Sequence, residues 1–304
     1  MRARYPLSFF ATIFALSCGS RTGLLAPEIE DAAPDVRDAS IDKLDAQEED
    51  ATEEDVVFPD VPVVSDCPDA GATLVYVLGA QNELYSFYPP TLEFKSIGTI
   101  ACPGTSSPNS MAVTRSGIAF TNFLDGHLFE VSTANAACKA TTYKPNQGNV
   151  TTYGMGYAGI ADGGETLFVA ENGGKSTSLG LGWIDTTSFT LDFVAQFQPT
   201  QFNCELSGTG AGQLFGFCPF ANGSYLIEID PATATVLSSH QLSAGSSNTS
   251  FAFAFWGGQF WIFTGNGGSV VTNYDPQTKK ESSVTTAPIE IVGAGVSTCA
   301  PLSL

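Results

Sequence analysis

Two glutamates and three aromatic residues are the strongest candidates for chemistry in this 304-residue chain. Glu205 and Glu290 lie beside short β-branched and aromatic runs, and a glycoside hydrolase needs two carboxyls roughly 5–10 Å apart, one with a raised pKa. Tyr153, Tyr157 and Trp256 carry flat rings of the kind that stack on sugars. Trp256 precedes two glycines and is expected at an exposed turn. These five side chains are therefore our candidate ligand-facing residues.

The other reactive patterns do not combine into a catalytic or metal site. Residues 173–177 (Gly-Gly-Lys-Ser-Thr) resemble the end of a phosphate-binding loop, but Val169 stands where the first glycine is required and no helix is expected to follow. His127 and His240 fall in separate segments, which argues against a shared metal or a Ser-His-Asp triad. The sequence contains no Cys-x-x-Cys pair. We therefore predict no catalytic residue, no metal site and no cofactor.

The N-terminus has the features of an export signal. A basic start is followed by an apolar run over residues 7–16, which is typical of a secretory signal peptide. Residues 15–18 (Ala-Leu-Ser-Cys) look like the lipobox of bacterial lipoproteins, in which the chain is cut before the cysteine and the thiol is lipidated. We expect a signal peptide over residues 1–17 and lipidation of Cys18. An ordinary signal cut nearby, without lipidation, is the alternative.

Acidic residues are concentrated in the segment that follows. The formal net charge of the chain is -19, and residues 27–66 hold fifteen acidic against two basic side chains. Such a segment has too few apolar residues to bury a core and its charges repel one another, so residues 18–66 are expected to be a disordered tether. Residues 67–304 hold sixteen acidic and seven basic side chains. Without a basic patch, nucleic-acid binding is not expected.

Residues 67–304 contain a repeat of β-strands. Short β-branched and aromatic runs alternate with Gly, Asn, Asp and Pro, and no segment keeps a 3.6-residue periodicity. The second turn of each unit falls 44, 53, 45 and 45 residues after the one before, at Tyr88, Ser132, Asp185, Asp230 and Asp275. A period of roughly 40–50 residues with four strands per unit is typical of a β-propeller blade. The sequence thus predicts an all-β, five-bladed propeller, with two separate sandwiches as the alternative.

The first unit lacks an inner strand, and an extra strand is expected near residues 289–296 at the end of the chain. We expect this strand to join the first blade and close the ring, which removes exposed sheet edges. Six cysteines remain after Cys18, an even number that suits disulfides in an exported protein. A Cys67–Cys299 bond would fasten the closure, and Cys204–Cys218 would join neighbouring strands. Cys102 and Cys138 are left to pair by elimination.

The two candidate glutamates lie at the ends of inner strands in this architecture. Glu205 and Glu290 each follow or enter an inner strand, so both are expected near one axial pocket. The simpler interpretation is that each carboxylate is solvated at the mouth of the ring. Three aspartates, Asp185, Asp230 and Asp275, occupy the repeated turn and are explained by it.

The order of a lipobox, an acidic tether and a secreted repeat domain resembles uncharacterised bacterial lipoproteins with a β-propeller domain. The resemblance covers architecture and repeat spacing and includes no functional motif. It implies a cell-envelope location, in the outer membrane because Gly19 rather than Asp follows the cysteine. The domain would then lie in the periplasm or at the cell surface, attached to the membrane through lipid alone. The sequence does not fix the oligomeric state, and we favour a monomer.

Three functions are compatible with these features. The first is a non-enzymatic module that binds a protein or a glycan. The second is a glycoside hydrolase with Glu205 and Glu290 at the axis, and the third is a structural envelope protein. We favour the binding module, because catalytic histidines and metal-ligand clusters are missing from the sequence pattern.

Overall fold

The computed structural model describes residues 67, 73–104, 106–171, 180–198, 203–220, 223–245 and 250–303. These residues belong to one compact unit, Val61–Leu304. The signal peptide over residues 1–17, Cys18 with the tether over 18–66, and the glycine-rich segment at 173–177 lie outside the described residues. The described residues form twenty β-strands and a 3-10 helix, η2 (Gln147–Asn149).

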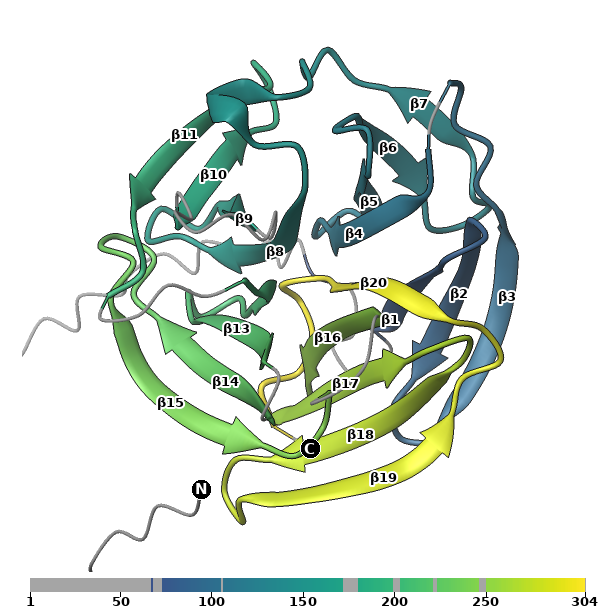
Figure 1. The fold of residues 1–304 in the computed structure, drawn as a ribbon, viewed down its shortest axis with the longest axis vertical. Coiled ribbons are helices and arrows are strands. Elements are labelled where there is room, and N and C mark those ends of the chain that lie inside the picture. The colour runs from purple at the N-terminus through teal and green to yellow at the C-terminus, as the bar shows by residue number, and fades with distance from the viewer. Residues whose placement is uncertain are drawn as a thin grey trace, which may run out of the picture. The chain divides into compact units, whose positions relative to one another are not determined.

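The strands form five four-stranded antiparallel sheets arranged as blades around a ring (Figure 1). Blade 1 contains β20 (Ile291–Val296), β1 (Val75–Gly79), β2 (Glu83–Tyr88) and β3 (Glu93–Thr99). Blade 2 contains β4 (Pro108–Val113), β5 (Ile118–Phe123), β6 (Leu128–Ser132) and β7 (Cys138–Ala140). Blade 3 contains β8 (Tyr153–Gly159), β9 (Glu165–Glu171), β10 (Leu181–Asp185) and β11 (Thr190–Ala195). Blade 4 contains β12 (Glu205–Gly208), β13 (Leu214–Phe220), β14 (Gly223–Ile229) and β15 (Val236–Leu242). Blade 5 contains β16 (Ser250–Trp256), β17 (Gln259–Gly265), β18 (Ser269–Asp275) and β19 (Lys280–Thr286).

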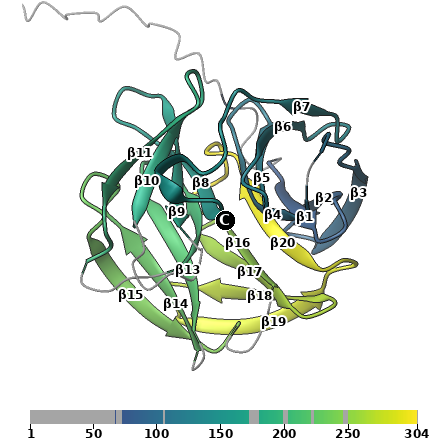
Figure 2. The ribbon, with the colours of Figure 1, turned by 45° about the horizontal axis from the view of Figure 1, so that its top comes forward.

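The five-bladed propeller predicted from the sequence is confirmed, and the alternative of two sandwiches is excluded. Each sheet follows the expected strand order, with the inner strands at the centre. The tilted view in Figure 2 also has the inner strands β4, β8, β16 and β20 at the centre of the ring.

The C-terminal strand closes the ring as predicted. β20 pairs with β1 in antiparallel register, from Val75 opposite Val296 to Leu78 opposite Gly293. A disulfide joins Cys67 to Cys299, with 5.3 Å between the Cα atoms. Because this bond lies just beyond the paired strands, it fastens the first described residue to the end of the closing strand.

The other two predicted disulfides are also confirmed. Cys204 and Cys218 are joined at the end of the β12–β13 pair, with 4.2 Å between Cα atoms. Cys102 and Cys138 link the end of blade 1 to the outer strand of blade 2, at 5.3 Å. Three disulfides are typical of proteins in extracellular or periplasmic compartments. Among the described residues, no helix is both long enough and apolar enough to cross a bilayer.

The repeated turn between third and fourth strands is held by its aspartate. Asp275 accepts hydrogen bonds from the Gln277 N–H and the Thr278 hydroxyl, both at 2.8 Å. These bonds, led by that from Thr278, lower the pKa of the Asp275 carboxyl. The residue four positions later has a left-handed backbone in all five blades, with φ from 56° to 60°. These residues are Leu92, Ala136, Phe189, Ala234 and Lys279.

The hydrophobic core consists of five clusters, one between each pair of neighbouring blades. Aromatic rings fill much of it. Phe87 of blade 1, for example, packs against Trp261 and Phe263 of blade 5, with ring centroids 5.5 and 5.7 Å apart. Outer strands such as β15 are mostly exposed, so they shield the clusters without contributing much to them.

The inner strands approach one another so closely that small residues are required. A Cβ atom on Gly154 of β8 would overlap the carbonyl oxygen of Cys204 and lie 2.6 Å from the Glu205 Cα atom. A Cβ atom on Gly293 of β20 would lie 3.0 Å from the backbone nitrogen of Met111. Neighbouring inner strands therefore approach each other at backbone contact distance where these glycines lie.

Candidate functional site

The two faces of the ring are distinguished by the direction of the inner strands. All five inner strands run in the same direction across the ring. We call the side where they begin, near residues 108, 153, 205, 250 and 291, the pocket face. The side where they end, near residues 113, 159, 208, 256 and 296, is the closure face.

Glu205 is the first residue of β12 and its carboxyl reaches across the axis. Its Oε2 accepts a 2.6 Å hydrogen bond from the hydroxyl of Ser110 on β4. That hydroxyl oxygen in turn accepts a 3.1 Å bond from the backbone N–H of Met155 on β8. The chain of contacts links blades 4, 2 and 3. Since blades 4 and 2 are not neighbours, the Glu205 carboxyl lies at the centre of the ring.

Burial makes Glu205 a weak acid. The side chain is 2% exposed, and the loss of hydration raises the pKa of its carboxyl well above the ordinary 4.5. The hydrogen bond from Ser110 and the nearby Met155 N–H oppose that shift without reversing it. Among the described residues it has no ion pair. Burial therefore favours the neutral carboxylic acid of Glu205 over its ionised form.

A pocket of about 330 Å³ opens at the pocket face, with Glu205 in its lining. Four of the five blades contribute to it. The described lining residues are Ala80, Gln81, Ser107, Pro108, Asn109, Leu124, Glu205, Ser250, Phe251 and Val292. We call this the axial pocket. Glu205 is the one ionisable side chain among these ten residues.

Asn109 and Ser250 each offer a hydrogen-bond acceptor to the axial pocket. The Asn109 amide nitrogen donates to Asn122 Oδ1 at 3.2 Å and to the Tyr153 carbonyl at 3.0 Å. Its own Oδ1 is thereby left as an acceptor. The Ser250 hydroxyl donates to the Gly265 carbonyl at 2.9 Å, so its oxygen can still accept. With the Glu205 carboxyl in its ionised form, these groups suit a ligand that donates hydrogen bonds.

The candidate aromatic residues do not line this pocket. Tyr153 and Tyr157 are 0% and 4% exposed and belong to the hydrophobic cluster between blades 2 and 3. Burial raises the pKa of both hydroxyls. In this conformation neither ring is accessible to a ligand. This burial corrects the expectation that they are ligand-facing.

Trp256 also requires a correction. It was expected at an exposed turn, but it is 2% exposed and lies in the cluster between blades 5 and 1. Its indole N–H donates to the Thr73 carbonyl at 2.9 Å. Trp256 therefore stabilises the join between the first and last blades.

The second candidate glutamate, Glu290, is not among the described residues that line the axial pocket. It is half-buried just before β20, and its carbonyl accepts a 2.8 Å hydrogen bond from the Ala80 N–H. The structure thus brings one of the two predicted carboxyls to the pocket.

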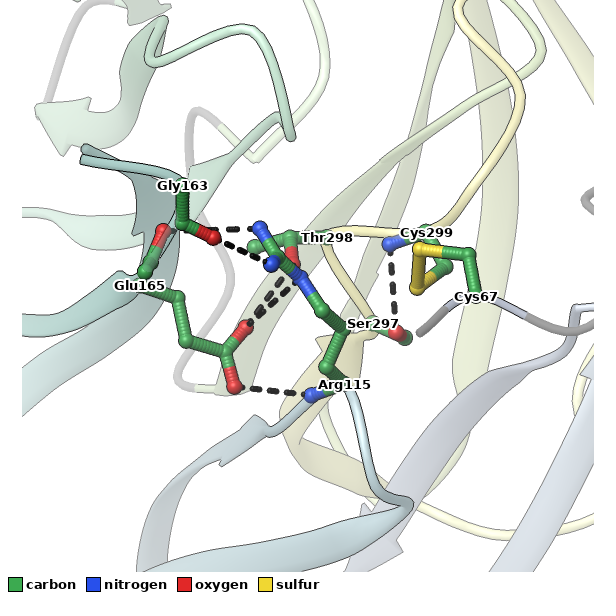
Figure 3. Close-up of a disulfide and its surroundings, with 8 residues drawn as sticks. Cys67, Arg115, Gly163, Glu165, Ser297, Thr298 and Cys299 are labelled. Carbon is green, nitrogen blue, oxygen red and sulfur yellow. Dashed lines mark hydrogen bonds and ion pairs between the residues drawn. A yellow bond between two sulfur atoms is a disulfide. The ribbon is translucent and has the colours of Figure 1, made fainter. Parts of the chain in front are cut away.

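The closure face has a charged cluster that the sequence analysis missed (Figure 3). Arg115 donates to the Gly163 carbonyl at 2.6 Å and to the Thr298 hydroxyl at 3.0 Å. Glu165 accepts from the Arg115 backbone N–H at 2.8 Å and from the Thr298 hydroxyl at 2.8 Å. Arg115 is the only arginine after residue 66, which was the available signal. The cluster joins blades 2 and 3 to the C-terminal segment beside the Cys67–Cys299 disulfide.

A second pocket, of about 470 Å³, lies between blades 4 and 5. Its lining includes Phe215, Phe260 and Leu302. His240 stacks on Tyr274 in its wall, with 5.1 Å between the ring centroids. Within the described residues, no group of three or more His, Cys, Asp or Glu side chains could hold a metal ion.

The fold and the pocket define a five-bladed β-propeller with a buried carboxylic acid at the mouth of its axis. No protein-family model and no curated protein matches the chain. A chain in a crystal structure of a nidogen/laminin complex is similar, with a TM-score of 0.48 and 14% identity over 79% of this chain and 84% of that chain. A chain of Kuenenia stuttgartiensis hydrazine synthase gives a TM-score of 0.40 and 12% identity, over 74% and 69% of the two chains. We derive no function from either similarity.

Proposed function

We propose that this protein is a lipoprotein of the cell envelope whose propeller is a non-enzymatic module that binds a protein or glycan ligand in the axial pocket. The observation that carries the proposal is the pocket itself. It combines the acceptor groups of Glu205, Asn109 and Ser250 with the apolar side chains of Leu124 and Phe251. Apolar side chains together with converging polar groups in a concave lining are characteristic of ligand sites, and the ten described lining residues divide evenly between the two kinds.

The attachment of the chain supports this use of the pocket face. The propeller begins at Cys67, which is bonded to Cys299 beyond the end of β20, on the closure face. The axial pocket is on the opposite face. If Cys18 carries a lipid and residues 18–66 form a tether, the attachment point leaves the pocket unobstructed. Anchoring in the outer membrane, a monomeric state and the absence of nucleic-acid partners belong to the same proposal.

Binding accounts for the pocket better than glycoside hydrolysis does. A glycosidase of the common type needs two carboxyls on either side of the scissile bond. The described lining of the axial pocket supplies one, Glu205, and Glu290 is not part of it. A purely structural envelope protein would have no need for an open site with unused acceptors, so that alternative is also weaker.

A pair of tryptophan substitutions tests the proposal. The full chain is screened against a glycan array and against proteins of the cell envelope. Ser107 is exposed and lines the axial pocket, so Ser107→Trp should obstruct the mouth without disturbing the core. Ser116 is an equally exposed serine in a turn on the closure face, so Ser116→Trp is the matched control.

The expected result is a ligand whose binding is abolished by Ser107→Trp and unchanged by Ser116→Trp. Equal loss in both variants, or loss with Ser116→Trp alone, would move the site away from the axial pocket. No binding to any glycan or envelope protein would favour the structural role instead. Turnover of a bound glycan by the wild type would contradict the non-enzymatic part of the proposal.

A further inference from the structure

Glu205 is an acid that the described part of the propeller leaves without a cationic partner. The contrast with Glu165 is informative, because Glu165 lies 4.0 Å from the Arg115 guanidinium and also accepts the Arg115 backbone N–H. Glu205 is more deeply buried than Glu165, yet its described hydrogen-bond donor is the neutral Ser110. Burying an acid is costly unless a partner of opposite charge accompanies it. A ligand can supply that charge.

The surroundings of Glu205 favour a positively charged ligand group. No Lys, Arg or His is among the described residues that line the axial pocket, so nothing there repels a cation. Asn109 Oδ1 and the Ser250 oxygen add acceptors, and Phe251 adds an aromatic side chain to the lining. Aromatic rings attract cations through the negative face of the π-system.

The charge of the whole domain acts in the same direction. Residues 67–304 hold sixteen acidic and seven basic side chains. A net negative surface raises the local concentration of cations and the rate at which they reach a site. An anionic ligand would meet both this field and an acid in the pocket.

We infer that the axial pocket recognises a primary ammonium or guanidinium group, such as a lysine or arginine side chain of a partner protein, through an ion pair with Glu205. This inference rests on the proposed binding function and specifies its ligand. The ligand nitrogen donates to the other carboxyl oxygen, Oε1, while Ser110 continues to donate to Oε2. At pH values where the carboxyl is protonated in the free protein, it loses its proton to solvent as the cation enters, so that the acid and the cation become an ion pair and one released proton.

Coupled proton release distinguishes this mode from binding of a neutral sugar. The described groups around the carboxyl are the neutral Ser110 and the Met155 N–H, so no other described charged group competes for the proton. Affinity for a cation should rise with pH until the Glu205 carboxyl of the free protein is ionised. A neutral hydroxyl-rich ligand would bind the acid form and release no proton.

Titration calorimetry of the full chain tests the inference. The probes are agmatine and N-acetyl-lysine methylamide, with N-acetyl-norleucine methylamide as the neutral counterpart. Titrations in two buffers of different ionisation enthalpy, neither a primary amine, count the protons released. We expect proton release to accompany cation binding and to decrease as the pH rises, and binding by Glu205→Gln that is weaker by roughly tenfold or more. Glu93→Gln, an exposed substitution on β3, is the control and should bind as the wild type does.

Each outcome separates this inference from the proposed function. Equal binding of the norleucine and lysine probes, or unchanged cation binding by Glu205→Gln, would overturn the ammonium inference. A second outcome is that no cation binds, while the wild type binds a glycan or another neutral ligand and Ser107→Trp abolishes that binding. The proposed function of the pocket then stands, and its assignment to cations is wrong. If neither cations nor any screened ligand binds, both fail.

Discussion

Glu205 shows how one buried side chain couples function to stability. Its pKa in the folded protein is raised well above the ordinary 4.5 because burial disfavours the ionised form. The folded state therefore retains a proton that the unfolded chain has lost between these two pKa values. The free energy of unfolding must fall as the pH rises through that interval.

We predict that Glu205→Gln removes this pH-dependent loss. The amide keeps the shape of the neutral acid and can still accept from Ser110, so the variant should match the wild type below about pH 4.5. As the pH rises above 4.5, the variant should become progressively the more stable protein. Denaturant unfolding at several pH values measures the difference.

The exposed Glu93→Gln substitution provides the comparison for that experiment. It changes the formal charge by the same amount, but its side chain lies in water. Its stability difference from the wild type should vary little over the same interval. A Glu205→Gln profile that parallels the wild type at every pH would mean that Glu205 is ionised in the free protein.

The sequence identified Glu205 but misjudged the aromatic candidates, for a geometric reason. Side chains of an inner strand alternate between the two neighbouring blades, so Tyr153, Met155 and Tyr157 all face blade 2 and none faces the axis. Glu205 and Ser250 reach the axial pocket from the first position of their inner strands, whereas Tyr153 holds the first position of β8 and is buried against blade 2. Strand patterns alone do not distinguish these positions.

At the scale of the elements, the repeated turns were predicted and their left-handed residue was not. Asp followed by Pro marks the turn in the sequence because both favour its local geometry. The residue four positions after the start of the turn has φ near 57° in every blade, yet Leu, Ala, Phe and Lys all occur there. Because no single residue type marks this position, its left-handed conformation could not be predicted from the sequence.

We predict that Lys279→Asn stabilises the protein by about 0.5–1 kcal/mol. Lys279 is exposed with φ of 56°, a conformation that disfavours most L-residues and that Asn tolerates better. The neighbouring Lys280→Asn is the matched control. Lys280 begins β19, where Asn is disfavoured, so that change should destabilise slightly. Thermal unfolding compares them, and a stabilising Lys280→Asn would argue against backbone strain as the cause.

The close approach of inner strands gives a second prediction at this scale. Gly154→Ala should destabilise the propeller by about 1–3 kcal/mol, because the added methyl group would meet the backbone of Cys204 and Glu205. The exposed Gly268 has nothing within 4 Å of an added Cβ atom, so Gly268→Ala is the control and should have little effect. Denaturant unfolding measures both. Equal changes in stability for Gly154→Ala and Gly268→Ala would mean that the inner strands can move apart without a loss of stability.

At the scale of the whole molecule, the closed ring could be predicted because the strands expected from the sequence did not divide into five complete blades in chain order. The first unit lacked an inner strand and the C-terminus had a spare one, and pairing them is the arrangement that leaves no edge at the axis. The axial pocket could not be predicted in the same way. Its lining comes from four blades, and the contacts that define it depend on how closely the inner strands approach.

The disulfide between Cys67 and Cys299 should be the largest covalent contribution to stability, because its cysteines are 232 residues apart. In the chain-entropy model, closing so long a loop contributes about 5 kcal/mol, against about 3 kcal/mol for the separation of 14 between Cys204 and Cys218. We predict that Cys67→Ala with Cys299→Ala loses more stability than Cys204→Ala with Cys218→Ala.

The two double variants should also lose protection from hydrogen exchange in different parts of the fold. Without Cys67–Cys299, protection should fall along β1 and β20, whose pairing joins the two ends of the ring, and the pocket residue Val292 lies on that closing strand. Unchanged protection along β1 and β20 in the variant without Cys67–Cys299 would show that the pairing of these two strands holds the ring closed without the disulfide.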